Sequence, residues 1–152
     1  MRIHILAVGR DRKGPSVDLV SDYAKRCPWR IELVEVPPRR QGTSRQRLVE
    51  EAEKLRQFFP KGAALIALDE RGQDLDSRAF ADRIQKFQLD GKNALCFVIG
   101  SADGLDPILV KSADLRLAFG RATWPHRLVR VMLSEQIYRA STILTGHPYH
   151  RD

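Results

Sequence analysis

The last eight residues of this 152-residue chain hold its densest group of chemically versatile side chains. Two imidazoles, a phenol and a guanidinium fall within five positions: His147, Tyr149, His150 and Arg151. Gly146 would end a preceding helix and Pro148 would stiffen the chain behind it, which indicates a directed tail rather than a frayed end. A protein that only binds has no need for these four side chains together, so the tail is a candidate catalytic segment.

Two other segments are candidates for binding. Residues 100–104 read Gly-Ser-Ala-Asp-Gly directly after an apolar run. Two glycines allow a close backbone approach to another group, although a simple tight turn would have the same pattern. Residues 119–126 read Phe-Gly-Arg-Ala-Thr-Trp-Pro-His. Pro125 suits the first turn of a helix because its missing N–H costs nothing there.

Several familiar motifs are missing from the sequence. Lys13 precedes Gly14, which is the reverse of the order in a phosphate-binding P-loop, and no strand is followed by G-x-G-x-x-G. There is no G-x-S-x-G nucleophile elbow and no H-E-x-x-H zinc motif. His147 and His150 are only two possible metal ligands, with no acid spaced to help them, so we expect no metal.

Charge points to a polyanionic partner. Lysine and arginine outnumber aspartate and glutamate by 26 to 19, which gives a formal net charge of +7 at pH 7. Residues 37–47 contain four arginines and no acid: Arg39, Arg40, Arg45 and Arg47. From Arg116 onward, six arginines face only Glu135 and Asp152. A basic surface of this kind attracts polyanions, and we expect nucleic acid as the partner.

The elements that must position these segments alternate along the whole chain. Apolar runs and alternating patterns predict strands at residues 2–9, 30–36, 63–68, 94–99 and 115–119. Helical spacing predicts helices at residues 17–27, 77–89, 107–111 and 125–144. Another helix, through residue 59, is expected to begin at Thr43 and Gln46, which have capping-box spacing.

This alternation predicts an α/β fold with a parallel, doubly wound sheet, because parallel strands need a crossover between them. Ligands of such sheets bind outside the carboxyl ends of the strands. The segments after Leu68, Ile99 and Phe119 are therefore expected to form a site.

The last helix is apolar on more than one side, so we expect both its own sheet and a second subunit to bury it. Its arginines are expected on the exposed edge, with Glu135 paired to Arg139 four residues later. These arginines are Arg127, Arg130 and Arg139.

Length and composition limit the classes that remain. Hydrophobic residues make up 43% and charged residues 30%, which argues against a disordered or collagen-like chain. The longest apolar runs have six residues, whereas a membrane-spanning helix needs roughly 20. Cys27 and Cys96 form no metal-binding pair and are expected to be reduced thiols. We expect one cytoplasmic domain over residues 1–152, without a membrane partner.

Six stretches together resemble the RlmH family, the small SPOUT-class methyltransferases that modify a pseudouridine in ribosomal RNA of the large subunit. They are LDERG at 68–72, VIG at 98–100, WPH at 124–126, LVRV at 128–131, EQIYRA at 135–140 and HPYHR at 147–151. The likeness covers nearly the whole chain, and its most specific parts are the tail and residues 125–131.

The resemblance implies a SPOUT (alpha/beta knot) fold with a C-terminal trefoil knot, a homodimer, and S-adenosylmethionine as the cofactor. Its reaction would be methylation of N3 of a pseudouridine in 23S ribosomal RNA, within the assembled ribosome or large subunit. By motif match, the cofactor residues would be Leu68, Gly100, Phe119, Gly120, Arg121, Ala122, Thr123 and Trp124. Ser101, Gly120 and Ala122 depart from the residues common in relatives, which bears on how tightly the cofactor is held.

The residue types also suggest roles in this reaction. N3 of pseudouridine attacks well only after losing its proton, which His150, His147 or Tyr149 would accept. Arg151 would stabilise the developing charge. RNA phosphates would be held by four other arginines: Arg130, Arg127, Arg39 and Arg40. Because the tail leaves a helix expected at a dimer interface, it is a candidate to complete the partner's site.

Two alternatives stay open at this level. The first is a basic RNA-binding module that uses a SPOUT-like fold without catalysis. The second is another doubly wound protein, such as a flavodoxin-like or nucleotide-binding enzyme. The second predicts a phosphate-cradling loop after the first strand, and residues 9–12 do not supply one convincingly.

Overall fold

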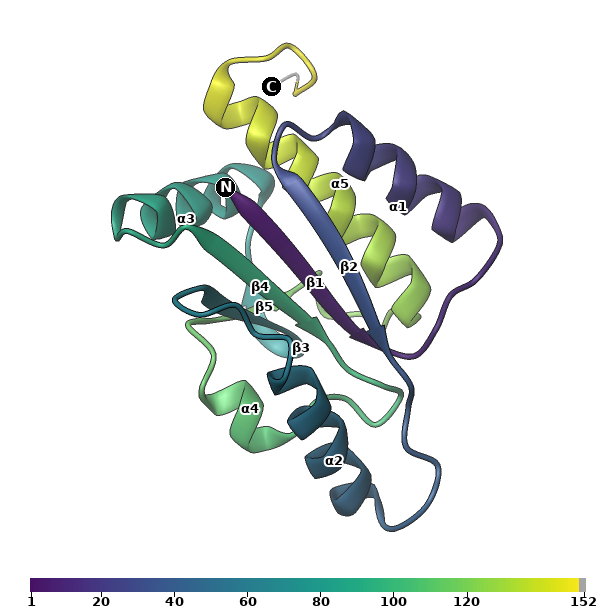
Figure 1. Ribbon diagram of the computed structural model, residues 1–152. Helices are drawn as coiled ribbons and strands as arrows, with labels where there is room; N and C mark the ends of the chain where they lie inside the picture. The colour runs from purple at the N-terminus through teal and green to yellow at the C-terminus, as the bar shows by residue number, and fades with distance from the viewer. Residues whose placement is uncertain (151–152) are drawn as a thin grey trace.

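The computed structural model describes residues 1–150, in which strands and helices alternate around one sheet (Figure 1). The strands are β1 (Arg2–Val8), β2 (Arg30–Val36), β3 (Ala64–Asp74), β4 (Ala94–Ile99) and β5 (Leu115–Ala118). The helices are α1 (Pro15–Arg26), α2 (Ser44–Arg56), α3 (Ser77–Leu89), α4 (Pro107–Lys111) and α5 (His126–Thr145). Every element expected from the sequence is present.

The sheet has five strands in the order β2-β1-β4-β3-β5, and all its pairings are parallel. β4 lies at its centre, and all six residues of this strand are buried. A continuous apolar run is what a strand covered on both faces requires. The predicted α/β parallel fold is thereby confirmed.

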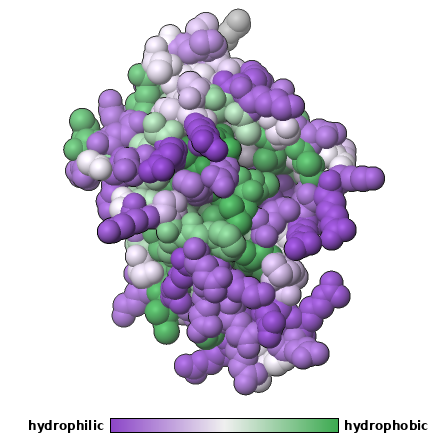
Figure 2. Space-filling model, viewed as in Figure 1, coloured by the Kyte–Doolittle hydropathy of each residue, from purple (hydrophilic) through white to green (hydrophobic). Residues whose placement is uncertain are grey.

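Helices cover both faces of the sheet. On one face α5 packs against α1 and α3, over a core that includes Phe80, Ile84, Leu133 and Ile137. On the other face α2 and α4 cover a smaller core of buried hydrophobic residues that includes Leu55. In Figure 2 an apolar band crosses the middle of the viewed face, between polar surfaces. α5 runs opposite to the strands, so it begins near their carboxyl ends (Figure 1).

Local signals set several helix boundaries. The hydroxyl of Thr43 accepts a hydrogen bond from the backbone N–H of Gln46 at 3.2 Å, and Oε1 of Gln46 accepts one from Thr43 N–H at 2.9 Å. The predicted capping box is therefore confirmed, although α2 ends at Arg56 and not at Phe59. Gly146 ends α5 with φ of 70°, a conformation that glycine adopts without strain.

β3 is longer than predicted, because polar residues 69–74 continue it beyond the apolar run. Its pairing with β4 stops at Ala67, and its register with β5 shifts between Leu68 and Gln73. Such an irregularity bends a strand and re-aims side chains. The trefoil knot stays a prediction, because strand order and pairing alone do not define how the chain is threaded.

Cys27 and Cys96 are both buried and free, as expected. Burial raises the pKa of the Cys27 thiol, and it raises the pKa of Cys96 to about 12. Both side chains therefore act as small apolar groups at neutral pH. Among residues 1–150, no helix combines the length and apolar character needed to cross a membrane.

Candidate functional site

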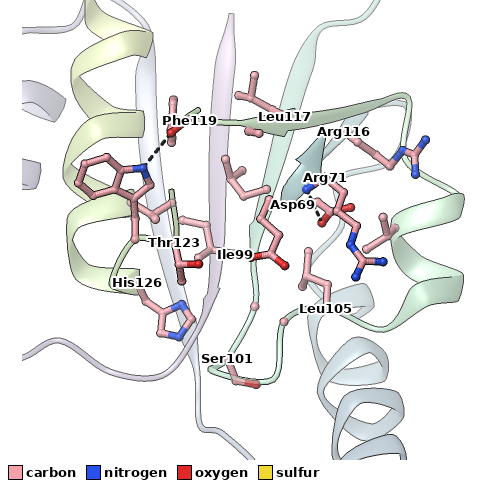
Figure 3. Close-up of a pocket in the computed structure, with 18 of the residues that line it drawn as sticks. Asp69, Arg71, Ile99, Ser101, Leu105, Arg116, Leu117, Phe119, Thr123 and His126 are labelled. Atoms are coloured by element: carbon pink, nitrogen blue, oxygen red, sulfur yellow. Dashed lines mark hydrogen bonds between the residues drawn. The ribbon is translucent and has the colours of Figure 1, made fainter. Parts of the chain in front are cut away.

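A cavity of about 980 Å³ lies at the carboxyl ends of β3, β4 and β5, and we call it the strand-end cavity (Figure 3). Its walls come from residues 68–71, 99–105, 116–120 and 122–124, with parts of α4 and the start of α5. These are the three strand ends at which the sequence predicts a site. The volume is at the upper end of the usual range for small-molecule sites, about 300–1,000 Å³.

The loop after β4 is folded tightly on itself. A Cβ atom at Gly100 would lie 2.2 Å from the carbonyl oxygen of Gly104, so only glycine fits there. The backbone N–H of Gly104 donates to the carbonyl of Ser101 at 2.8 Å, and Gly104 has φ of 85°. The close backbone approach expected from these glycines therefore occurs between residues of the loop itself.

Two arginines of α2 hold this loop from outside. Nη2 of Arg47 donates to Oδ2 of Asp103 at 3.0 Å, and Nη2 of Arg56 lies 3.9 Å from Oδ2 of Asp106. The Arg47 guanidinium also donates to the carbonyl of Gly42 at 2.8 Å and to the hydroxyl of Ser44 at 3.0 Å. Because these local bonds already orient Arg47, it meets Asp103 at a smaller entropic cost than a free side chain.

The segment after β5 is closed by one hydrogen bond. Nε1 of Trp124 donates to the carbonyl of Phe119 at 2.8 Å, which holds the ends of residues 119–124 together (Figure 3). The N–H of Gly120 donates to Oδ1 of Asp74 at 3.2 Å and ties the segment to β3. Seven of the eight predicted cofactor residues line the strand-end cavity, and Arg121 is the one that does not.

Besides its charged side chains, the cavity offers backbone polar groups and apolar walls. Leu68, Ile99, Leu117 and Phe119 supply apolar surface, while residues 100–104 and 119–124 bring peptide groups to the edge. Within the described part of the chain, no group of three or more His, Cys, Asp or Glu residues is placed to hold a metal. An adenine ring with an apolar extension suits such a lining.

His126 also lines the cavity, and the sequence singled it out only as part of a motif. It begins α5 and lies below Thr123 in Figure 3. Burial lowers the pKa of its imidazole, and the nearby charge of Arg130 lowers this pKa further. A depressed pKa keeps His126 neutral at pH 7, and a neutral imidazole can accept a proton.

The expectation that Arg130 lies on an exposed edge is wrong. Its side chain is 4% exposed, and Nη1 lies 2.5 Å from Oε1 of Glu35 on β2. Nη2 donates to the carbonyl of Gly9 at 2.8 Å. Because α5 crosses the ends of β1 and β2, Arg130 joins the helix to the sheet. It is buried in the protein and has no free face for a phosphate.

The other predicted RNA-binding arginines are at the surface. Arg127 is exposed, and its Nε lies 3.5 Å from Oδ1 of Asp11. Arg39 is paired with Glu50, and Arg40 is exposed in the same loop. Arg139 pairs with Glu135 at 2.6 Å, as its spacing predicts.

The tail is folded onto the far end of α5. The ring of Tyr149 lies 4.6 Å from that of Tyr138, centroid to centroid, and its hydroxyl donates to Glu135 at 3.2 Å. The guanidinium groups of Arg26 and Arg139 lie 5.3 and 5.0 Å from the Tyr149 ring centre. The predicted directed tail is therefore ordered by contacts as far as residue 150.

This position raises the pKa of the Tyr149 phenol to about 12, first through burial and then through a hydrogen bond with Tyr23 and the charge of Glu135. The phenol is a poor proton acceptor while it stays there. Nδ1 of His147 accepts a hydrogen bond from the Tyr149 N–H at 3.2 Å, and Nδ1 of His150 is buried without a partner. Arg151 lies outside the described residues.

None of the described tail residues lines the strand-end cavity. α5 has 20 residues, and a helix of that length spans roughly 30 Å. Its first residue borders the cavity, and the tail follows its last. In Figure 1 the tail lies beside the amino ends of the strands, at the end of the sheet opposite to the strand-end cavity. The structure therefore does not bring His147, Tyr149 and His150 to the predicted cofactor residues within one protomer.

Comparisons with known proteins identify the family of this chain. The family model for predicted SPOUT methyltransferases matches residues 1–150. The chain is 48% identical over 159 residues to the ribosomal RNA large subunit methyltransferase H of Brucella anthropi, with 99% of each chain covered. It is 50% identical over 160 residues to the protein of that name from Paracoccus denitrificans, with 100% of each chain covered.

A solved structure supports the fold alone. A candidate RNA methyltransferase from Bacillus anthracis superposes with a TM-score of 0.53 at 12% identity, covering 97% of this chain and 96% of that one. The sequence identity to named relatives over their full length supports a family assignment, whereas this distant structure supports only the fold. The chain belongs to the RlmH family of SPOUT methyltransferases.

Proposed function

We propose that this protein transfers a methyl group from S-adenosylmethionine to N3 of a pseudouridine in 23S ribosomal RNA. The strand-end cavity carries the proposal, since a family of methyltransferases must hold a methyl donor and this cavity gathers the three predicted cofactor segments. The relatives' names specify ribosomal RNA of the large subunit. The same reaction places the protein with ribosomes in the cytoplasm.

The residues present fit the donor. Leu68 and Phe119 give apolar walls for an adenine ring, and the loops at Gly100 and Gly120 present peptide groups to its polar edge. When bound, S-adenosylmethionine supplies a methyl group already activated on a sulfonium. The protein has to align the target nitrogen with that methyl group and remove the N3 proton.

We propose that this proton goes to the tail of the partner subunit. Within one protomer the tail is separated from the cavity by the length of α5. Leu128 on α5 is 46% exposed, and Val131 and Met132 are half-buried, so α5 keeps an apolar face for a second copy. A dimer formed through this face would allow each tail to reach the other subunit's cavity.

In this arrangement His150 accepts the N3 proton, and His147 is the next candidate. The donor, held by the residues of the strand-end cavity, would supply the methyl group to N3. Tyr149 would position the base ring rather than accept the proton, given its raised pKa. Arg151 would stabilise negative charge on the deprotonated base.

Calorimetry and mixed dimers test this proposal. S-adenosylmethionine should bind the wild-type protein and a variant truncated after Gly146 with equal affinity, while the truncated variant transfers no methyl group. A dimer of one truncated subunit and one full-length subunit with a blocked cavity should regain activity, because the intact tail and the intact cavity then meet. An inactive mixed dimer would refute sharing of the tail, and failure of the wild-type protein to bind the donor would refute the proposed reaction.

A further inference from the structure

One wall of the strand-end cavity carries three cations, which we call the basic wall. It consists of Arg71 on β3, Lys111 at the end of α4 and Arg116 on β5, all exposed. Figure 3 shows Arg71 and Arg116 on the side of the cavity next to α4, opposite His126 and Thr123. Within residues 1–150, none of the three has an ion pair.

Close backbone packing holds two of these arginines near each other. A Cβ atom at Gly72 would lie 2.7 Å from the carbonyl carbon of Arg116, so β3 and β5 approach closely between the two side chains. This contact falls where the register of β3 with β5 shifts. The irregular part of β3 therefore places Arg71 beside Arg116 at the mouth of the cavity.

The neighbouring acids do not neutralise this wall. Oδ1 of Asp69 accepts a hydrogen bond from the backbone N–H of Arg71 at 3.2 Å, and Glu70 is exposed. Oδ2 of Asp114 accepts from the backbone N–H of Leu65 at 2.8 Å. No ion pair joins any of these carboxylates to the basic wall among the described residues.

Four other arginines near the strand ends each contact a carboxylate: Arg47 with Asp103, Arg56 with Asp106, Arg127 with Asp11 and Arg130 with Glu35. The three cations of the basic wall differ from these four, because they are exposed at the cavity mouth and have no ion pair among the described residues. This is the arrangement expected for binding an anion from solution.

We propose that the basic wall binds a backbone phosphate of the RNA beside the target nucleotide. This inference rests on the proposed function, since the base must reach a donor held in the same cavity. A guanidinium group can donate two parallel N–H hydrogen bonds to two oxygens of a phosphate, and the ammonium group of lysine adds a compact positive charge. Ile99 and Leu117 would hold the donor at the apolar floor of the cavity, whereas the basic wall is exposed at its mouth, where an RNA strand would arrive.

The test measures RNA binding and donor binding separately. The variants are Arg71→Ala/Arg116→Ala and Lys111→Ala, and the control is Arg30→Ala. Arg30 is an exposed arginine at the amino end of β2, at the other end of the sheet, and it lacks an ion pair in the described structure. Affinity for large ribosomal subunits lacking the modification is measured over a range of salt concentrations, and S-adenosylmethionine affinity by calorimetry.

We expect the double variant to bind the subunits about tenfold more weakly, with a salt dependence reduced by about one phosphate contact, and Lys111→Ala to lose less affinity than the double variant. Donor affinity should stay within about twofold, and Arg116→Lys should retain only part of the binding, because the charge remains while the paired N–H donors are lost. Unchanged subunit affinity and salt dependence would overturn the inference. Weaker donor binding with unchanged subunit binding would assign the wall to the donor's carboxylate instead. Failure of wild-type methyl transfer would refute the proposed function without altering this binding test.

Discussion

Replacing Arg47 by alanine should weaken donor binding, although Arg47 itself does not line the strand-end cavity. The variant removes the hydrogen bond from Nη2 to Asp103, which lies in the tight loop after β4 that forms one wall. The turn keeps its own backbone bond between Ser101 and Gly104, so the loop should loosen at its tip rather than unfold.

The expected loss of donor affinity follows from the solvent exposure of the Arg47–Asp103 pair. The side chains are 23% exposed for Arg47 and 41% for Asp103, so this is a surface pair with water beside it. Such pairs contribute about 0.2–1 kcal/mol. If all of that energy goes into holding the loop in its binding shape, the dissociation constant for S-adenosylmethionine should rise by about 1.4- to fivefold.

Calorimetry at low and high salt provides the assay. Arg45→Ala is the matched control, because Arg45 lies in the same turn of α2, is exposed and has no ion pair among residues 1–150. The cycle of Arg47→Ala, Asp103→Ala and the double variant should be non-additive, with the double variant no weaker than the weaker single one. Additive losses, or wild-type affinity in Arg47→Ala, would refute the idea that this pair shapes the loop.

Three further predictions concern stability. Arg130→Ala should lower the free energy of unfolding by about 3 kcal/mol, because it leaves Glu35 and the Gly9 carbonyl without their buried partner; a loss below about 1 kcal/mol in urea titration would contradict that role. Leu133→Ala should cost about 2–5 kcal/mol, since Leu133 is fully buried between α5 and the sheet; the same titration measures it, and a surface-like value would contradict the packing. The pKa of His126 is lowered in the folded state, so the unfolded chain takes up this proton first and stability falls as pH drops below about 6.5. His126→Asn should flatten that part of the curve of melting temperature against pH, and an unchanged slope would show that His126 is not the group responsible.

The sequence was most informative where one residue pattern sufficed for one element. Six consecutive apolar residues identify β4 because its strand is covered on both faces. Thr43 and Gln46 define the start of α2 through bonds made within four residues. The three strand ends were predicted as the site because parallel strands bring their carboxyl ends to one edge.

Features that depend on long-range contacts were missed. Helical spacing places Arg130 near Arg127, but only the crossing of α5 over β1 and β2 brings the Gly9 carbonyl and Glu35 to it. The extension of β3 through polar residues is stabilised by pairing with β5, which no local pattern reveals. The basic wall depends on that same pairing, since Arg71 and Arg116 are far apart in sequence.

For the tail, the sequence predicted the residue types of a functional segment but not its position in the molecule. Its residue types indicated catalysis, and its order through Tyr149 is confirmed, but its place in the molecule depends on the length and direction of α5. The separation of the described tail from the strand-end cavity within one protomer favours the expectation from the sequence that the tail completes the partner's site.

Methylation of N3 of a pseudouridine in large-subunit ribosomal RNA is the reaction that we propose for this protein. The direct measurement incubates it with isotope-labelled S-adenosylmethionine and ribosomes that lack the modification, and then identifies the labelled nucleoside by mass spectrometry after digestion. We expect label on 3-methylpseudouridine from 23S RNA alone. Label on another nucleoside, or none on any RNA, would contradict it.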